Sequence, residues 1–183
     1  LLLEKAIELF STYGYHQTKI SDIVKAADLT QPTFYLYFQS KEALFKDLNA
    51  EFRMHFNAIL DEGQSHLVTK QGTVSDKMLR NLTQLFSYFV EHPNLTKIGF
   101  YNSDEAQQLK NELVQLVAQA IMSEKEQYMI FKHLETNIVA ESLVGSIERL
   151  TLTKLLTKEK NPEKLAEEII NIYFAREKEL IRQ

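Results

Sequence analysis

The chain has 183 residues, 44% of them hydrophobic, and a formal net charge of −4. Cysteine is absent, which excludes a disulfide framework and any thiolate metal site and fits a reducing cytoplasm. No apolar run approaches the ~18 residues of a membrane span, and no signal peptide opens the chain. Because the first residue is Leu1 rather than Met, we expect that the natural N-terminus, with any basic arm, is missing from this sequence.

Glycine and proline are rare, at five and three residues, which favours a mainly helical chain. The first predicted helix ends at Gly14, where we expect a left-handed cap. Its apolar face consists of Leu3, Ala6, Ile7, Phe10 and Tyr13.

The segment from Ile20 to Lys41 has the layout of a helix-turn-helix DNA reader, with a three-residue turn at 28–30. The side chain of Thr30 is predicted to cap the second helix, which has Pro32 in its first turn. Phe34 and Phe38 are expected to point inward. The side chains left for base edges and phosphates are Gln31, Thr33, Tyr35, Leu36 and Tyr37.

Longer helices follow the helix-turn-helix segment. Ser40 is predicted to cap one that ends near Gly63, before a loop at 63–75. A second runs over 78–89 until His92-Pro93 stops it; a short apolar piece at 95–101 follows, and Ser103 is predicted to cap a third, running to 121. The segment 128–133 fits a short strand, a helix end or a loop. Two long helices close the chain, over 135–156 and from Asn161-Pro162 onward.

The first ~50 residues resemble the N-terminal domain of TetR-type transcriptional regulators. The matching positions are Gly14-Tyr15, Thr18, Asp22-Ile23-Val24, Ala27-Asp28-Leu29-Thr30, the run 33–38 and Ser40-Lys41-Glu42-Ala43-Leu44. The resemblance implies a DNA-binding domain at 1–46. It also implies an all-α ligand-binding domain at 47–183 that forms a homodimer through the last two helices.

Individual residues then receive predicted roles in DNA binding. Gln31 and Thr33 are the candidate base readers, and Leu36 is a candidate for apolar contact with a thymine methyl group. Lys41, at the Ser40-capped helix start, either contacts a phosphate or is a plain solvated lysine. The remaining candidates for contact with DNA are Lys19, Thr30, Pro32, Tyr35 and Tyr37, of which the two tyrosines could also be structural.

Three positions depart from the family pattern. Asp28 stands where glycine is usual in the turn, and Leu36 replaces a frequent polar or aromatic residue. Lys19 replaces the residue that usually caps the first helix of the motif, so Thr18 is predicted to take over this cap. Residues 1–50 hold five lysines and six acidic residues; DNA binding would therefore rest on a few well-placed cations.

An apolar ligand is expected in the second domain, where Phe86, Phe89, Phe100 and Tyr101 either line a pocket or fill the core. Asn137 and Glu141 either orient that ligand or are simply exposed. The histidines are scattered singly, so no metal site is predicted, and no cofactor is expected. Catalytic motifs are absent from the sequence, so we expect no enzyme.

The sequence therefore predicts a ligand-responsive regulator, a repressor in the simplest case, that binds a near-palindromic operator in double-stranded DNA as a homodimer and is released by a small apolar effector. One alternative is a ligand-binding or interaction protein that has lost specific DNA binding. The other is a non-specific DNA-binding protein.

Overall fold

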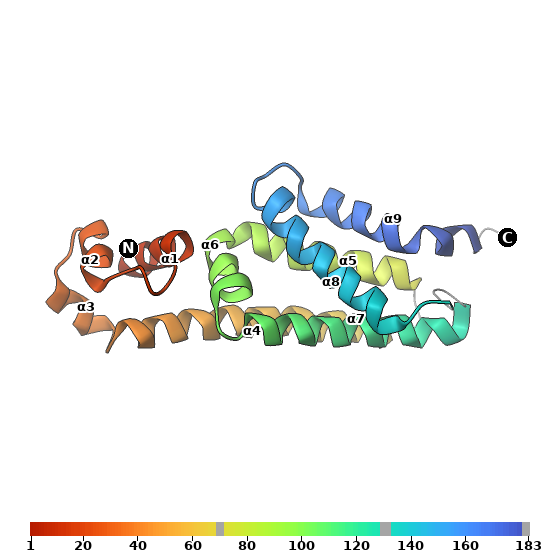
Figure 1. Ribbon diagram of the computed structural model, residues 1–183, viewed down its shortest axis with the longest axis horizontal. Helices are drawn as coiled ribbons and strands as arrows, with labels where there is room; N and C mark the ends of the chain where they lie inside the picture. The colour runs from red at the N-terminus through yellow and green to blue at the C-terminus, as the bar shows by residue number, and fades with distance from the viewer. Residues whose placement is uncertain (69–71, 129–132, 181–183) are drawn as a thin grey trace. The chain divides into compact units, whose positions relative to one another are not determined.

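The computed structural model describes residues 1–68, 72–128 and 133–180 of the chain. In these three ranges the regular elements are helices, in agreement with the predicted all-α fold (Figure 1). None of the helices within them combines the length and the hydropathy that crossing a lipid bilayer requires.

The chain forms two compact units, and both are discontinuous in sequence. The first consists of residues 1–55 and 92–107, and the second of residues 56–91 and 108–183. The predicted boundary at residue 46 lies inside helix α4 (Lys41–Val68), which contributes to both units. The division into independent domains at 1–46 and 47–183 stays a prediction.

The first unit contains α1 (Leu2–Tyr13), α2 (Ile20–Ala26), α3 (Gln31–Tyr37) and the start of α4. Its core is aromatic and aliphatic: Ala6, Phe10, Ile23, Phe34 and Leu44 have no exposed surface. Burial of these side chains is the main stabilising term for so small a unit. The predicted face of α1 is partly wrong, because Leu2 is buried while Leu3 and Tyr13 are 39% and 62% exposed.

The connector between α1 and α2 is tied back to α1. Gly14 ends α1 with a φ of 81° and a ψ of 162°, a region that favours glycine but is not the predicted left-handed helical cap. The buried Thr18 hydroxyl donates to the carbonyl oxygen of Gly14 at 2.8 Å. Thr18 therefore does not cap α2. The Asp22 carboxylate accepts the Lys19 backbone N–H there, at 3.1 Å.

The segment 92–107 also belongs to the first unit. It contains α6 (Pro93–Thr96) and a π-helix, η1 (Lys97–Asn102), which both contact α1. A Cβ atom at Gly99 would lie 2.2 Å from the ring of Phe52 on α4, so only glycine permits this approach. Ser103 does not cap the next helix with its side chain; its hydroxyl donates to the carbonyl oxygen of Gly99 at 2.8 Å.

The second unit contains the rest of α4, α5 (Val74–Glu91), most of α7 (Ala106–Tyr128), α8 (Thr136–Leu150), the π-helix η2 (Thr151–Leu155) and α9 (Pro162–Leu180). Helix α5 packs along α9. The prediction that α4 ends near Gly63 is wrong, because α4 continues to Val68. Gly63 instead gives room to Asn81 on α5. The Asn81 side-chain amide donates a hydrogen bond to the carbonyl oxygen of Gly63 at 3.1 Å.

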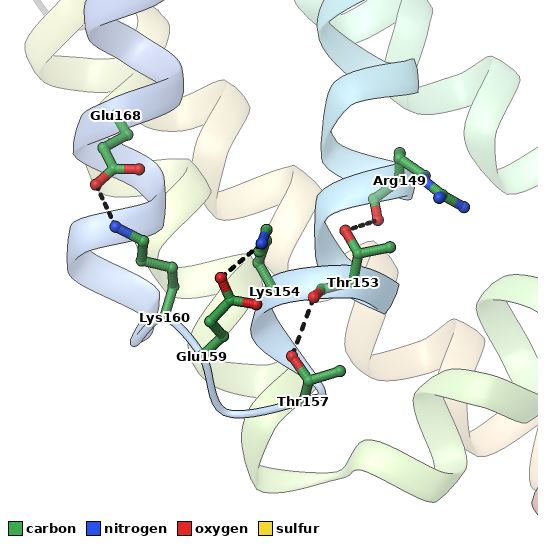
Figure 2. Close-up of polar contacts among 7 residues, drawn as sticks. All are labelled: Arg149, Thr153, Lys154, Thr157, Glu159, Lys160 and Glu168. Carbon is green, nitrogen blue, oxygen red and sulfur yellow. Dashed lines mark hydrogen bonds and ion pairs between the residues drawn. The ribbon is translucent and has the colours of Figure 1, made fainter.

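Polar contacts fix the connection between the last two helices (Figure 2). The Lys154 ammonium donates to the Glu159 carboxylate at 2.5 Å, and that of Lys160 donates to Glu168 on α9 at 2.6 Å. Asn161 caps α9 as predicted, since its Oδ1 accepts the Lys164 backbone N–H at 2.8 Å. Of the ambiguous segment at 128–133, residues 129–132 lie outside the described residues.

Candidate functional site

The turn between α2 and α3 adopts the conformation that the helix-turn-helix layout requires. Asp28 has a φ of 56°, in the left-handed region that aspartate tolerates better than most residues. The Leu29 backbone N–H donates to the carbonyl oxygen of Val24 at 2.8 Å, which closes the turn on α2. The departure from glycine at position 28 is thus accommodated without loss of the turn.

Helix α3 begins after Thr30 with Pro32 in its first turn, as predicted. The predicted side-chain cap is not formed, because the Thr30 hydroxyl is hydrogen-bonded to the Thr33 hydroxyl at 2.9 Å. This pair brings together two predicted DNA-contacting residues on the first turn of the helix.

The two faces of α3 differ sharply. Phe34 is fully buried and Phe38, just beyond the helix, is half-buried. The opposite side presents large side chains to solvent, with Tyr35 56%, Leu36 82% and Tyr37 71% exposed. Large exposed apolar groups gathered on one short helix are typical of a binding surface. Gln31 and Pro32 are exposed and Thr33 is half-buried.

Lys41 has an internal role that the sequence did not predict. Its ammonium donates to the carbonyl oxygens of Tyr15 and Thr18, at 2.9 and 3.0 Å. It also lies 4.1 Å from the centre of the Tyr15 ring, a cation–π contact. Lys41 therefore holds the α1–α2 connector against the start of α4, and its contact with a phosphate stays a prediction.

The start of α4 carries the predicted cap and a carboxylate held by its neighbours. The Ser40 hydroxyl accepts the Ala43 backbone N–H at 3.0 Å. Hydrogen bonds from the Glu42 backbone N–H, then from Tyr15 and Ser40, keep the pKa of the Glu42 carboxyl below its usual value. Burial, and then the hydrogen bond to Glu42, raises the pKa of Tyr15. Tyr15, Lys41 and Glu42 thus form one network between the α1–α2 connector and the start of α4, which a linear motif does not reveal.

The predicted ligand-contacting residues are divided between the two units and differ in exposure. Phe86 and Phe89 on α5 are fully buried, as is Phe100, while Tyr101 is half-buried. Phe100 and Tyr101 belong to the first unit, and their rings pack edge to face at 5.3 Å. The remaining two, Asn137 and Glu141, are exposed on α8.

The second unit instead contains an apolar cavity of about 50 Å³. Residues of α4, α5, α7, α8 and α9 line it, and the polar side chain among them is that of Asn81. None of the six predicted ligand-contacting residues is among those that line it. Lining residues include Leu60, Leu85, Leu113, Leu116, Ile147 and Ile170.

A polar groove adjoins this cavity between α4 and α7. Leu60 and Leu116 line both the cavity and the groove, so these two side chains border both spaces. The groove is otherwise lined by amides and carboxylates, and it has a volume of about 330 Å³. Its polar lining consists of Asn57, Asp61, Gln64, Glu112, Gln115 and Gln119.

Known proteins that match the N-terminal residues, and those that match most of the chain, are both bacterial transcriptional regulators. Residues 2–48 match the family described as bacterial regulatory proteins, tetR family. The chain is 39% identical over 171 residues to the HTH-type transcriptional regulator YdgC of Bacillus subtilis (strain 168). That alignment covers 93% of this chain and 88% of the relative.

Solved structures share the fold. A TetR-like transcriptional regulator from Rhodococcus sp. RHA1 superposes with a TM-score of 0.77 at 20% identity, over 94% of this chain and 91% of that one. The transcriptional regulator FadR from Bacillus subtilis, solved in complex with stearoyl-CoA, superposes with a TM-score of 0.67 at 20% identity. The latter match covers 94% of this chain and 95% of that one.

Proposed function

Because this chain belongs to the tetR family of bacterial regulatory proteins and is a ligand-responsive transcriptional regulator, we propose that it is a repressor that a small apolar effector releases from DNA. The observation that carries the DNA-binding part is the exposed face of α3. Three large side chains there, Tyr35, Leu36 and Tyr37, are mostly exposed on a helix whose other side is anchored by the fully buried Phe34.

In the proposed complex, α3 lies in the major groove of the operator. Gln31 and Thr33 contact base edges, and Leu36 contacts thymine methyl groups, because it offers apolar surface and no hydrogen bond. Tyr35 and Tyr37 bind phosphates at the groove rim. The flanking contacts come from the start of α3 and from both sides of the motif, namely Lys19, Thr30, Pro32 and Lys41.

The proposed homodimer forms through α8 and α9. Ile138 on α8 and Ile172 on α9 are 62% and 73% exposed, although each lies on the apolar stripe of its helix. The hydroxyl of Tyr173 on α9 is hydrogen-bonded to those of Ser142 and Ser146 on α8, at 3.0 and 2.8 Å. A paired helix surface with exposed isoleucines suits a self-complementary contact between two copies.

Effector binding would act through α4. The cavity of about 50 Å³ holds no more than a small part of a chain, so a larger ligand requires the helices that line it, α4 among them, to separate. Helix α4 begins in the unit that carries α3. A ligand that binds better to the separated form therefore shifts the population away from the DNA-binding form, by reciprocity of coupling. The stearoyl-CoA complex of the structurally similar FadR supports a chain-like effector.

The test is a fluorescence-anisotropy titration on the DNA upstream of the protein's own gene, at two salt concentrations and against competitor DNA. We expect a specific complex whose affinity falls with salt. The Tyr37→Phe variant should weaken binding across sequences, and Gln31→Ala should relax discrimination at one base pair. Absence of any preference over competitor DNA would refute specific operator binding and favour the alternatives.

A further inference from the structure

We propose that the base pairs contacted by α3 are A·T pairs, and that α3 recognises thymine by its methyl group through the apolar surface of Pro32 and Leu36. The inference rests on the proposed function and names the class of operator that this helix fits. It follows from the positions and the chemistry of the exposed side chains of α3.

The centre of the exposed face of α3 is apolar. Leu36 is 82% exposed, more than either tyrosine of the helix. Pro32 is also exposed and lies four residues earlier, which places it on the same face of the helix as Leu36 and opposite the buried Phe34. When α3 lies in the major groove with Phe34 turned toward the rest of the first unit, this apolar pair faces the base edges. Thymine is the base that presents a methyl group there.

Polar side chains lie on both sides of this apolar centre. Tyr35 and Tyr37 are each one residue from Leu36, so they stand about 100° from it around the helix, in opposite directions. This arrangement directs the two tyrosines toward the two walls of the groove, where the phosphates lie. Gln31 is exposed four residues before Tyr35. Its amide carries the donor and the acceptor that match N7 and the N6 amino group of adenine.

The usual readers of G·C pairs are absent from this helix. The run 29–40, all of which the structure describes, contains no lysine, arginine, histidine, aspartate or glutamate. Guanine is typically read by arginine or lysine and cytosine by a carboxylate, so α3 offers neither group. The Thr33 hydroxyl, which suits any base edge, is already hydrogen-bonded to that of Thr30 at 2.9 Å. The exposed groups of α3 therefore match adenine and thymine.

The nearest lysines lie beside α3 rather than on it. Lys25 is exposed in the last turn of α2, the helix that crosses the DNA backbone in this motif. The Lys41 ammonium, at the start of α4, donates to the carbonyl oxygens of Tyr15 and Thr18. Attraction to phosphates is thus separated from base recognition, which is left to the amide and the apolar side chains of α3.

The first test selects duplexes from a library with a randomised centre, using the full chain in the presence of competitor DNA. Selections with Gln31→Ala and Leu36→Ala identify the positions that α3 reads, since the base preference changes there. We expect A·T pairs at these positions in each half-site for the native protein. Replacement of one such pair by G·C should weaken binding about tenfold.

The second test replaces thymine by uracil, which removes the methyl group and leaves every hydrogen-bonding group of the base pair unchanged. At a position that Leu36 reads, this replacement should weaken binding by the native protein about fourfold, the effect of one buried methyl group. The Leu36→Ala variant should lose this preference for thymine. The control Met54→Ala removes an apolar side chain that is 61% exposed on α4 and should retain the preference.

The outcomes separate this inference from the proposed function. A half-site with G·C pairs at the positions that Gln31 and Leu36 read overturns the inference and leaves specific operator binding intact. The same holds if uracil changes no affinity of the native protein, or if it weakens binding by Leu36→Ala equally. Selection that enriches no sequence over competitor DNA overturns the repressor, and this inference with it.

Discussion

The proposed DNA-reading surface on α3 and the apolar cavity of the second unit differ in the direction that their side chains face. In the first unit the core includes the fully buried rings of Phe10, Phe34 and Phe52, and the candidate binding groups of α3 are exposed to solvent. In the second unit the side chains that line the apolar cavity point inward. The proposed function therefore asks for no rearrangement of the α3 surface before DNA binds, whereas it asks the cavity of about 50 Å³ to enlarge before a ligand of any length enters.

The largest expected effect tests the filled core under α3. Phe34→Ala should lower the free energy of unfolding by about 3–5 kcal/mol, because it removes a fully buried ring. The matched control Tyr35→Ala, one residue along and 56% exposed, should change it by about 0.5 kcal/mol or less while weakening DNA binding. Urea denaturation measures both. Equal losses would contradict the distinction between the two faces.

A second change tests how tightly the π-helix η1 is packed. Gly99→Ala places a methyl group 2.2 Å from the ring of Phe52, so the ring or the helix must move. Overpacking of this kind costs about 1–3 kcal/mol. Gly63→Ala is the control, since its new methyl meets the end of the Asn81 side chain at 3.0 Å and should cost less. A Gly99→Ala protein as stable as the native one would show that this contact is loose.

The third prediction concerns the role of Lys41. Lys41→Met removes two hydrogen bonds to carbonyl oxygens and should cost about 1–2 kcal/mol in unfolding free energy. Loss of the proposed contact of Lys41 with a phosphate should also make the slope of operator affinity against salt smaller by about 1. An unchanged slope would contradict this contact and leave Lys41 with its internal role alone. Lys46→Met, at an exposed position further along α4, is the control for loss of charge.

The smallest effect is on the titration of Glu42. The pKa of the Glu42 carboxyl is lower in the folded protein than in the unfolded chain. The ionised carboxylate therefore stabilises the fold at pH values above the pKa of the unfolded chain, and this stabilisation is lost as the pH falls through the pKa of the folded protein. Tyr15→Phe removes one of its donors and should move the pKa of Glu42 up, toward the ordinary 4.5. Carbonyl-carbon NMR titration measures the shift. Tyr13→Phe, at an exposed tyrosine, should leave this pKa unchanged.

The amino-acid sequence alone determined the helix-turn-helix, because its signals are local. Pro32 at the start of α3, the Ser40 cap and the four-residue spacing of Phe34 and Phe38 act within one or two turns of a helix. The same holds for the Asn161 cap at the start of α9. The inward and outward faces of α3 therefore follow from the pattern.

Tertiary structure decided the features that depend on residues distant in sequence. From the sequence, Gly63 indicates a helix end and Lys41 a surface lysine. In the folded chain Gly63 gives room to Asn81, and the carbonyl oxygens of Tyr15 and Thr18 accept hydrogen bonds from the Lys41 ammonium. The apolar stripes name the core residues, but they do not show where packing leaves a space. The cavity and its carboxylate-lined groove exist because α4, α5, α7, α8 and α9 meet imperfectly, and periodicity along one helix carries no information about the fit between several.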